Sequence, residues 1–329
     1  MTTINDIAKL ANVSRTTVSR VLNNNGYVSD EVRKRIMKIV EETGYIPSLS
    51  AKSLRTKKSG VIGVILPKIS TETASRVVSG INEVVASENF QILLTDTELN
   101  KEKEIEYIRL LQSRHVDGII LLATNINDRL ISTIEDAALP FISLGQDLPG
   151  VTSIVYDDYH ASVDMTNMLI GQGHDKIAFI GVGEEDPSVG VERKKGYFDS
   201  LEKHQLLIND SWIQLGDFSI ESGYECMKKI VKRNEDNLPT AVFVVTDRMA
   251  IGAMEYLREQ GIRIPQDMAV AGIGASTLSQ YVTPALTTID YFNKEAGKKA
   301  AQLLLQQLKQ KKEKEKFIQT YRLIKRDSV

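Results

Sequence analysis

The chain has 329 residues, of which 42% are hydrophobic and 26% are charged, so it is long enough for two or three folded domains of ordinary globular composition. Its single cysteine excludes an internal disulfide, and its four histidines lack the spacing of metal ligands. No apolar run approaches the roughly 20 residues of a membrane span, and the first residues lack the features of a signal peptide. We therefore expect a cytoplasmic protein without a membrane segment, a metal or another cofactor.

The charge is distributed unevenly along the chain. Residues 1–60 contain 11 Lys+Arg and 5 Asp+Glu, whereas the remaining residues contain 30 and 38. A small basic head on an acidic body indicates a polyanionic partner for the head. A solvated basic face would have the same composition, so charge alone leaves both interpretations open.

The head is predicted to contain three short helices. The first runs from about Ile4 to Ala11, with Thr3 as its N-cap in a variant of the capping box. After the turn "NVS", Ser14 caps a second helix from Arg15 to about Asn23. Ser29 then caps a third helix that ends at Gly44.

The second helix is too polar for a core helix. On a helical wheel Val18, Val21 and Leu22 share one side, whereas Thr16, Arg20 and Asn23 lie opposite and Arg15 and Ser19 flank them. Arginine reads guanine edges and hydroxyls bond phosphates or bases, so the pattern favours a helix-turn-helix unit with this helix in the DNA major groove. The alternative is a polar surface helix in a small bundle.

These residues also carry a family resemblance. "INDIAKLANVSRTTVSRVLNN" closely resembles the N-terminal motif of LacI/GalR transcription regulators, and "GYIPSLSAKSLRT" resembles their hinge segment. The resemblance implies that Arg15 and Thr16 are the main base readers. The full set of DNA-contacting positions expected here is Thr3, Ser14, Arg15, Thr16, Thr17, Ser19, Arg20, Asn23, Ser29, Ala51, Leu54 and Arg55.

Residues 46–60 form the expected hinge. A helix of two turns after Pro47 is too short to be stable alone in water, and a basic linker is the simpler interpretation. The family resemblance implies that the segment folds on the operator beside the same segment of a second subunit. Leu54 would then wedge into the minor groove, so Leu54→Ala should weaken specific binding more than nonspecific binding.

Residues 61–329 alternate between apolar strand-like runs and amphipathic helical runs, which predicts parallel sheets flanked by helices. The units are too many for one sheet, and the acidic "SIVYDDYH" is interpreted as an irregular interruption. We expect an all-α helix-turn-helix head and an α/β, two-lobed core that resembles the family's periplasmic-binding-protein-like fold. The expected boundaries are 1–45 for the head, 46–60 for the hinge, 61–158 with 290–317 for the N-terminal lobe, and 159–289 with 318–329 for the C-terminal lobe.

An effector site is expected beyond the carboxyl ends of the strands, in the cleft between the lobes. "SVGVERKKGY" matches the family segment that carries an effector-binding arginine, here Arg193, and Asp247 is expected to cap the helix after Thr246. The predicted effector contacts are Lys68, Gln146, Asp147, Ser188, Arg193, Thr246, Arg248 and Gly274.

One departure from the family concerns charge. Gly274 in "VAGIGASTL" takes the place of an aspartate that usually bonds sugar hydroxyls, and Lys68, Arg193 and Arg248 are cationic. This combination favours a sugar phosphate over a neutral sugar, unless Lys68 and Arg248 face solvent. The segments "GIGAS" and "VGVERKKGY" are similar to those of sucrose-type regulators.

The sequence therefore predicts a repressor of a carbohydrate operon rather than an enzyme. No complete G-x-G-x-x-G or G-x-S-x-G motif indicates a nucleotide or nucleophile site. The chain lacks the leucine-heptad tail by which some relatives tetramerise, so we expect a homodimer on a pseudo-palindromic operator. A cytoplasmic sugar-binding module and a corepressor-dependent regulator of a non-sugar pathway remain the alternatives.

Overall fold

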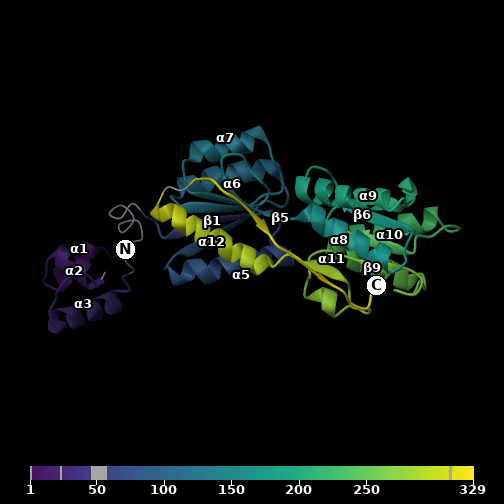
Figure 1. Ribbon diagram of the computed structural model, residues 1–329. Coiled ribbons are helices and arrows are strands. Elements are labelled where there is room, and N and C mark those ends of the chain that lie inside the picture. The colour runs from purple at the N-terminus through teal and green to yellow at the C-terminus, as the bar shows by residue number, and fades with distance from the viewer. Residues whose placement is uncertain (1, 23, 46–57, 311–312) are drawn as a thin grey trace. The chain divides into compact units, whose positions relative to one another are not determined.

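The computed structural model describes residues 2–22, 24–45, 58–310 and 313–329 (Figure 1). The chain divides into two compact units, residues 1–59 and 60–329. The first unit is called the head below, and the second the core. In the described residues no helix is long and apolar enough to cross a membrane.

The head consists of α1 (Ile4–Leu10), α2 (Arg15–Leu22) and α3 (Asp30–Thr43). Thr3 and Asp6 form a full capping box at the start of α1, and the Ser14 hydroxyl accepts the Thr17 amide at 3.1 Å at the start of α2. Gly44 ends α3 in a left-handed conformation. These ends agree with the predicted ones, apart from Ser29, which precedes α3 but makes no capping hydrogen bond.

A small apolar core holds the three helices together. Ile7, Val18, Val21 and Ile36 are buried at its centre, and Leu22 packs against them while partly exposed. The predicted apolar edge of α2 is therefore the face that docks on α1 and α3. A core of this size stabilises the head only modestly, since burying one such side chain contributes about 1.5–3 kcal/mol.

The N-terminal lobe is built on a six-stranded parallel sheet of order β11-β5-β4-β3-β1-β2. Its strands are β1 (Val61–Leu66), β2 (Gln91–Asp96), β3 (Gly118–Leu122), β4 (Phe141–Gly145), β5 (Thr152–Tyr156) and β11 (Lys316–Gln319). Four helices flank it: α5 (Glu72–Ser87), α6 (Lys101–Ser113), α7 (Asp128–Ala137) and α12 (Asn293–Lys309). Alternate strand residues pack against α5 and α12 on one face and against α6 and α7 on the other.

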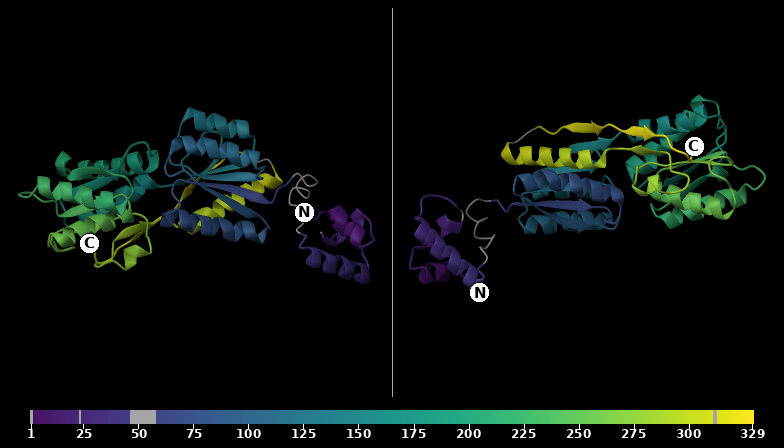
Figure 2. Two further views of the ribbon diagram at one scale, coloured as in Figure 1. Left: turned by 180° about the vertical axis from the view of Figure 1, so that it is seen from behind. Right: turned by 90° about the horizontal axis from the view of Figure 1, so that it is seen from below.

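The close approach of α5 and α12 depends on two glycines. A Cβ atom on Gly80 would meet the carbonyl oxygen of Lys294, and one on Gly297 would meet the carbonyl oxygen of Val77. Figure 2 shows the two helices side by side under the sheet. Any larger residue at either position would have to push the helices apart, because backbone atoms cannot move aside as a flexible side chain does.

The C-terminal lobe is built on a four-stranded parallel sheet of order β7-β6-β8-β9. Its strands are β6 (Ile177–Val182), β7 (Ile213–Gly216), β8 (Ala241–Val244) and β9 (Ala269–Ala271). The flanking helices are α8 (Asp158–Gly171), α9 (Arg193–Lys203), α10 (Ile220–Arg233) and α11 (Asp247–Glu259), and a π-helical turn, Pro187–Glu192, leads into α9. Short 3₁₀ turns lie at Asp210–Trp212 and Leu278–Gln280.

In the described part of the core, the chain crosses between the lobes three times, after β5, after β10 (Thr288–Asp290) and after β11. After the last crossing, β12 (Arg322–Ile324) pairs antiparallel with β10. The expected boundary between 317 and 318 is wrong, because all of β11 through Gln319 pairs with β5 in the N-terminal lobe. The interpretation of "SIVYDDYH" as an interruption is also wrong, because Thr152–Tyr156 forms a strand between β4 and β11.

Candidate functional site

A cavity of about 220 Å³ lies between the two lobes of the core. Its lining residues follow β1, β3, β4 and β5 of one sheet and β6, β8 and β9 of the other. Because a water molecule occupies about 30 Å³ of liquid, this volume has room for a small molecule rather than a single water. Ligands of parallel sheets bind beyond such strand ends, so the cavity is the candidate ligand site.

Seven of the eight residues predicted to contact an effector line this cavity: Lys68, Gln146, Ser188, Arg193, Thr246, Arg248 and Gly274. Asp147 does not line it, which corrects that prediction. Its carboxylate pairs with Lys316 Nζ at 2.8 Å, on side chains that are about half exposed.

Arg193 lies at the centre of a buried cluster on the cavity wall. Its Nε donates to Asp158 Oδ1 at 2.6 Å, its Nη1 donates to the Val245 carbonyl, and its guanidinium lies 5.4 Å from the Tyr291 ring centre. Burial alone would lower the pKa of Arg193, but the Asp158 carboxylate raises it above the ordinary value, so the guanidinium stays charged. Arg193, the arginine that the family resemblance assigned to the effector, is thus already paired with a carboxylate.

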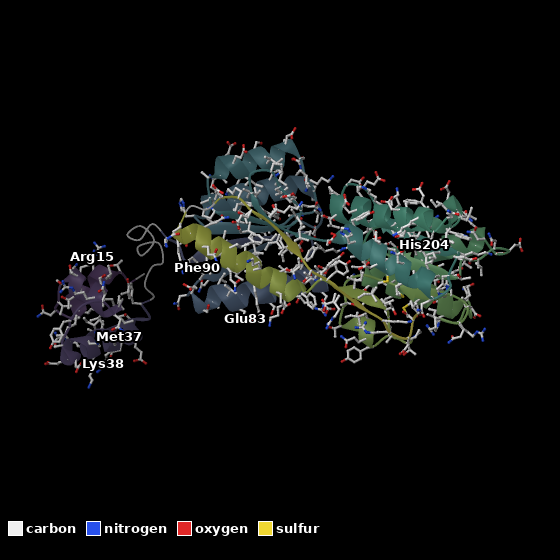
Figure 3. The ribbon with its side chains drawn as sticks, viewed as in Figure 1. Arg15, Met37, Lys38, Glu83, Phe90 and His204 are labelled. Atoms are coloured by element: carbon white, nitrogen blue, oxygen red, sulfur yellow. The ribbon has the colours of Figure 1, made fainter. Side chains whose placement is uncertain are left out.

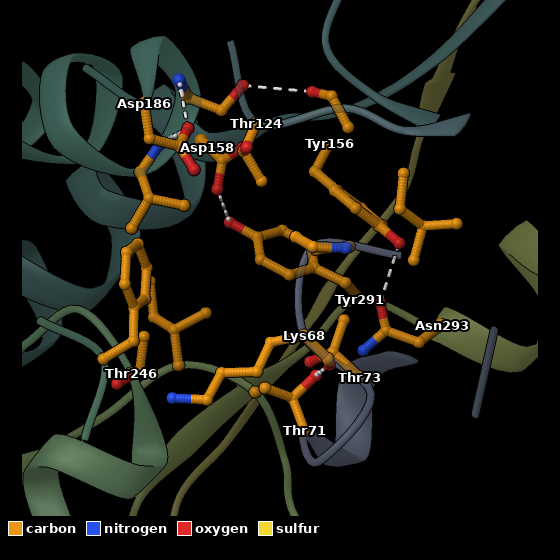
Figure 4. A pocket seen from close by; sticks show the side chains of 18 of the residues that line it. Lys68, Thr71, Thr73, Thr124, Tyr156, Asp158, Asp186, Thr246, Tyr291 and Asn293 are labelled. Carbon is orange, nitrogen blue, oxygen red and sulfur yellow. Dashed lines mark hydrogen bonds between the residues drawn. The ribbon is translucent and has the colours of Figure 1, made fainter. Parts of the chain in front are cut away.

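Tyr291 completes this cluster. Its hydroxyl donates to the same Asp158 Oδ1 at 2.8 Å, as Figure 4 shows, and its ring packs 4.8 Å from that of Tyr156. Burial and then the neighbouring Asp158 carboxylate raise the pKa of Tyr291 well above its usual range. Tyr291 therefore remains a neutral hydrogen-bond donor.

One rim of the cavity is closed by hydrogen bonds between the lobes. Gln146 Nε2 donates to Asp186 Oδ1 at 2.9 Å, and the Ser188 hydroxyl lies 3.0 Å from the Gly145 carbonyl and 3.1 Å from Gln146 Oε1. Asp186 also caps the π-helical turn through the amides of Ser188 and Val189. Burial raises the pKa of Asp186, and these hydrogen bonds offset part of that shift.

The opposite rim is closed by a second set of contacts. The Glu72 carboxylate accepts the Thr277 amide at 2.8 Å and the Thr277 hydroxyl at 2.7 Å, and Arg248 Nη1 lies 3.4 Å from the Ser70 carbonyl. Both sets join residues of one lobe to residues of the other. A rotation that separates the lobes at either rim must therefore break the hydrogen bonds at that rim.

The charges of the cavity contradict the expected excess of cations. Three cationic side chains line it, but so do four carboxylates: Glu72, Asp158, Asp186 and Asp247. Gly274 itself carries no carboxylate, and its φ of +140° is one that residues with a side chain rarely adopt. The absence of an acid at Gly274 is therefore outweighed by acids at other positions.

The turn after β8 also differs in one respect from the prediction. Thr246, and not Asp247, caps α11, since its side chain accepts the Met249 amide at 3.3 Å. The Asp247 carboxylate instead accepts the Ser276 amide at 2.6 Å and the Thr288 hydroxyl at 2.5 Å. It thereby fixes the loop that carries Gly274.

Several cavity residues were not predicted, chief among them Tyr156, Asp158, Phe218, Tyr291 and Asn293. Tyr156 and Asp158 stand at the end of β5, where the strand-end rule would have found them had the strand been recognised. Tyr291 and Asn293 follow β10, a strand of three residues that is too short to show a periodic pattern.

The predicted DNA-contacting residues of α2 are accessible on the head. Ser14, Arg15, Thr16 and Arg20 are exposed, and Figure 3 shows Arg15 at the end of the head away from Lys38 of α3. Thr17 and Ser19 are partly exposed, and Thr17 Oγ1 lies 2.9 Å from Ser14 Oγ. Exposed Thr3 and Ser29 precede α1 and α3, whereas Asn23, Ala51, Leu54 and Arg55 lie outside the described residues.

Two family models match the chain. Residues 3–48 match bacterial regulatory proteins of the lacI family, and residues 166–329 match the periplasmic binding protein-like domain. Catabolite control protein A of Priestia megaterium is 32% identical over 87% of this chain and 86% of its own length. The HTH-type transcriptional repressor PurR of Aliivibrio fischeri (strain MJ11) is 33% identical over 94% of this chain and 93% of its own.

Solved structures agree with these matches over nearly the whole chain. The lac repressor dimer bound to operator and the anti-inducer ONPF has a TM-score of 0.87 and 26% identity, covering 99% of this chain and 98% of its own. The transcriptional regulator CelR in complex with cellobiose has a TM-score of 0.75 and 26% identity over both complete chains.

The helix-turn-helix head and the two-lobed core thus match the same regulators that the two family models and the full-length relatives identify. The relatives are transcription regulators and not enzymes, which agrees with the exposed polar face of α2. The chain belongs to the LacI family of DNA-binding transcription regulators.

Proposed function

We propose that this protein represses a carbohydrate-utilisation operon in the cytoplasm, as a homodimer on a pseudo-palindromic operator, and that a sugar in the core cavity controls its DNA affinity. The observation that supports control by a ligand is the cavity itself, because both lobes line it and hydrogen bonds between the lobes close both of its rims. A ligand that contacts both lobes favours one arrangement of them over another.

The sugar part of the proposal has two sources of support. Aromatic rings of Tyr156, Tyr291 and Phe218 offer apolar faces, and carboxylates and hydroxyls stand beside them, which is the mixture that a sugar ring requires. Two similar structures hold cellobiose and the anti-inducer ONPF, respectively. By linkage, a sugar that weakens DNA binding must itself bind the DNA-bound form less tightly.

The DNA part is tested by selecting binding sites from random duplexes with the purified full-length protein. Dissociation constants are then measured by electrophoretic shift on the selected site and on a scrambled one. Arg15→Ala should weaken binding to the selected site about 10- to 100-fold, the usual cost of one lost base contact. Lys38→Ala, an exposed basic residue of the same unit on α3, is the matched control and should change binding far less.

Failure to enrich any sequence would contradict the proposal, as would an equal loss in the Arg15 and Lys38 variants. The same assay, repeated with sugars, tests control by a ligand. A panel that includes sucrose and sucrose 6-phosphate should contain a compound that changes the affinity for the selected site. The direction of that change distinguishes an inducer from a corepressor.

A further inference from the structure

Three buried side-chain polar atoms of the described residues have no hydrogen-bond partner: Thr95 Oγ1, Trp212 Nε1 and Asp158 Oδ2. Only the third belongs to a residue that lines the cavity. The Asp158 side chain is 2% exposed, so solvent does not satisfy this oxygen. Buried polar groups without a partner are rare in folded proteins, and one on the wall of a ligand cavity indicates a contact that a ligand completes.

The rest of the Asp158 carboxylate is fully occupied. Oδ1 accepts both Arg193 Nε and the Tyr291 hydroxyl, so the position and orientation of the group are fixed by two donors from α9 and from the segment after β10. An ionised carboxylate accepts hydrogen bonds and donates none. The ligand atom that reaches Oδ2 must therefore carry a hydrogen, as a hydroxyl does and a phosphate dianion does not.

The charges around Asp158 also favour a hydroxyl over a phosphate group beside it. The Arg193 charge is already compensated by Asp158, and the Asp186 carboxylate lies close enough to both groups for their charges to act on its pKa. Figure 4 shows Lys68 at the other end of the cavity from Asp158 and Asp186. An anionic group placed beside Asp158 would face two carboxylates and one guanidinium that is already paired.

We propose that Asp158 determines the specificity of this regulator: its free Oδ2 accepts a hydroxyl of an uncharged polyhydroxyl ligand and disfavours phosphorylated ones. The inference rests on the proposed function, since it concerns the sugar that binds in the same cavity. It replaces the sequence-based preference for a sugar phosphate. That preference counted Arg193 as a free cation and did not include Asp158.

The test uses the purified full-length protein and a panel of D-ribose, D-glucose, sucrose and cellobiose with glucose 6-phosphate and sucrose 6-phosphate. Thermal shifts identify which compounds bind, and isothermal titration calorimetry gives their dissociation constants. The uncharged member of a sugar and sugar-phosphate pair should bind more tightly than its phosphate. This comparison needs no substitution and decides the question even if a variant fails to fold.

Asp158→Asn gives the second measurement. Asparagine has the same shape and retains one oxygen for Arg193 and Tyr291, but it places an amide donor where Oδ2 was. The uncharged sugar should bind about 10- to 100-fold more weakly, as expected for loss of a hydrogen bond to a charged group, while the phosphate should lose nothing or gain.

Asp157→Asn is the matched control. It is the same substitution one residue earlier, at the N-cap of α8, where the side chain is one-third exposed and outside the cavity lining. It should leave every dissociation constant within about twofold, because asparagine also caps helices. Folding of both variants is checked by the fluorescence of Trp212, the only tryptophan, which is buried in the same lobe.

Two results would overturn the inference while the sugar-regulator proposal stands: binding of the phosphorylated compounds only, or a folded Asp158→Asn variant that binds the uncharged sugar as the wild type does. Binding of none of the six compounds would instead overturn both. Tighter binding of the uncharged sugar, lost in Asp158→Asn and kept in Asp157→Asn, is the result that we expect.

Discussion

The buried pair of Arg193 and Asp158 supports a quantitative prediction about stability. Both side chains are less than a tenth exposed and lie 2.6 Å apart, so removal of one leaves the other charge buried with no counter-ion. Removing one partner of such a pair costs about 3–5 kcal/mol of unfolding free energy. Arg193→Ala and Asp158→Ala should each destabilise the C-terminal lobe by about this amount.

The double variant should behave differently from the sum of the single ones. Removal of both charges leaves no unpaired ion, so its loss should not exceed that of either single variant. The coupling free energy is then about 3 kcal/mol or more, well above the roughly 0.5 kcal/mol within which independent sites add. With an m-value of about 2 kcal/mol/M, each single substitution lowers the urea midpoint by about 1.5–2.5 M.

The assay is urea unfolding followed by the fluorescence of Trp212. This tryptophan is buried in the C-terminal lobe core, so it reports the lobe in which the pair lies. The exposed pair of Arg258 and Glu255 is the matched control, and its two alanine variants should leave the midpoint unchanged. Additive losses at Arg193 and Asp158 would refute the reasoning.

Three further predictions concern other parts of the chain. Burial raises the pKa of Glu104 from 4.5 to about 7, so the folded protein holds this proton more strongly than the unfolded chain. The contribution of this group to the free energy of unfolding is therefore greatest below pH 4.5 and falls by about 3 kcal/mol as the pH rises to 7. Glu104→Gln should remove this pH dependence, which is measured by comparing the unfolding midpoints at pH 5 and pH 8. Gly297→Ala should destabilise the core by about 2 kcal/mol or more in thermal unfolding scans, because its Cβ would meet the Val77 carbonyl. Leu54→Ala should weaken binding to the selected DNA site much more than to scrambled DNA.

Each of these three predictions has a control variant or a result that would contradict it. Glu106→Gln, on the exposed face of the same helix, should leave the pH dependence as in the wild type, and an equal change in both variants would remove Glu104 as the cause. Gly171→Ala, where a Cβ meets nothing within 4 Å, should be neutral or stabilising by up to about 1 kcal/mol. Equal losses of Leu54→Ala on both DNAs would argue against a wedge at the centre of the site.

Most helices and strands of the fold could be predicted from local sequence patterns. We could predict the helices of the head and the alternation of strands and helices in the core because apolar residues on the buried face of a helix or strand recur at a fixed period. The error at "SIVYDDYH" has a physical reason: β5 is five residues long, and its partner β11 lies about 160 residues further along the chain. Nothing within the segment indicates that two neighbouring strands cover it.

The DNA-binding face of α2 and the cavity of the core differ in how much of each could be predicted from the sequence. The polar face of α2 lies on one helix, so Arg15, Thr16 and Arg20 could be placed from periodicity and family resemblance alone. In the cavity, the strand-end rule placed Lys68, Gln146, Ser188, Arg193 and Thr246 correctly at its wall.

The charge of the cavity was decided only by tertiary structure. The sequence determined that Arg193 is present, but not that Asp158, 35 residues earlier, neutralises it. It also could not show that Arg193 and Tyr291 both donate to Oδ1 of that carboxylate and leave Oδ2 without a partner. Electrostatic pairing depends on distances of a few ångströms between segments far apart in the chain, and those distances exist only after the chain has folded.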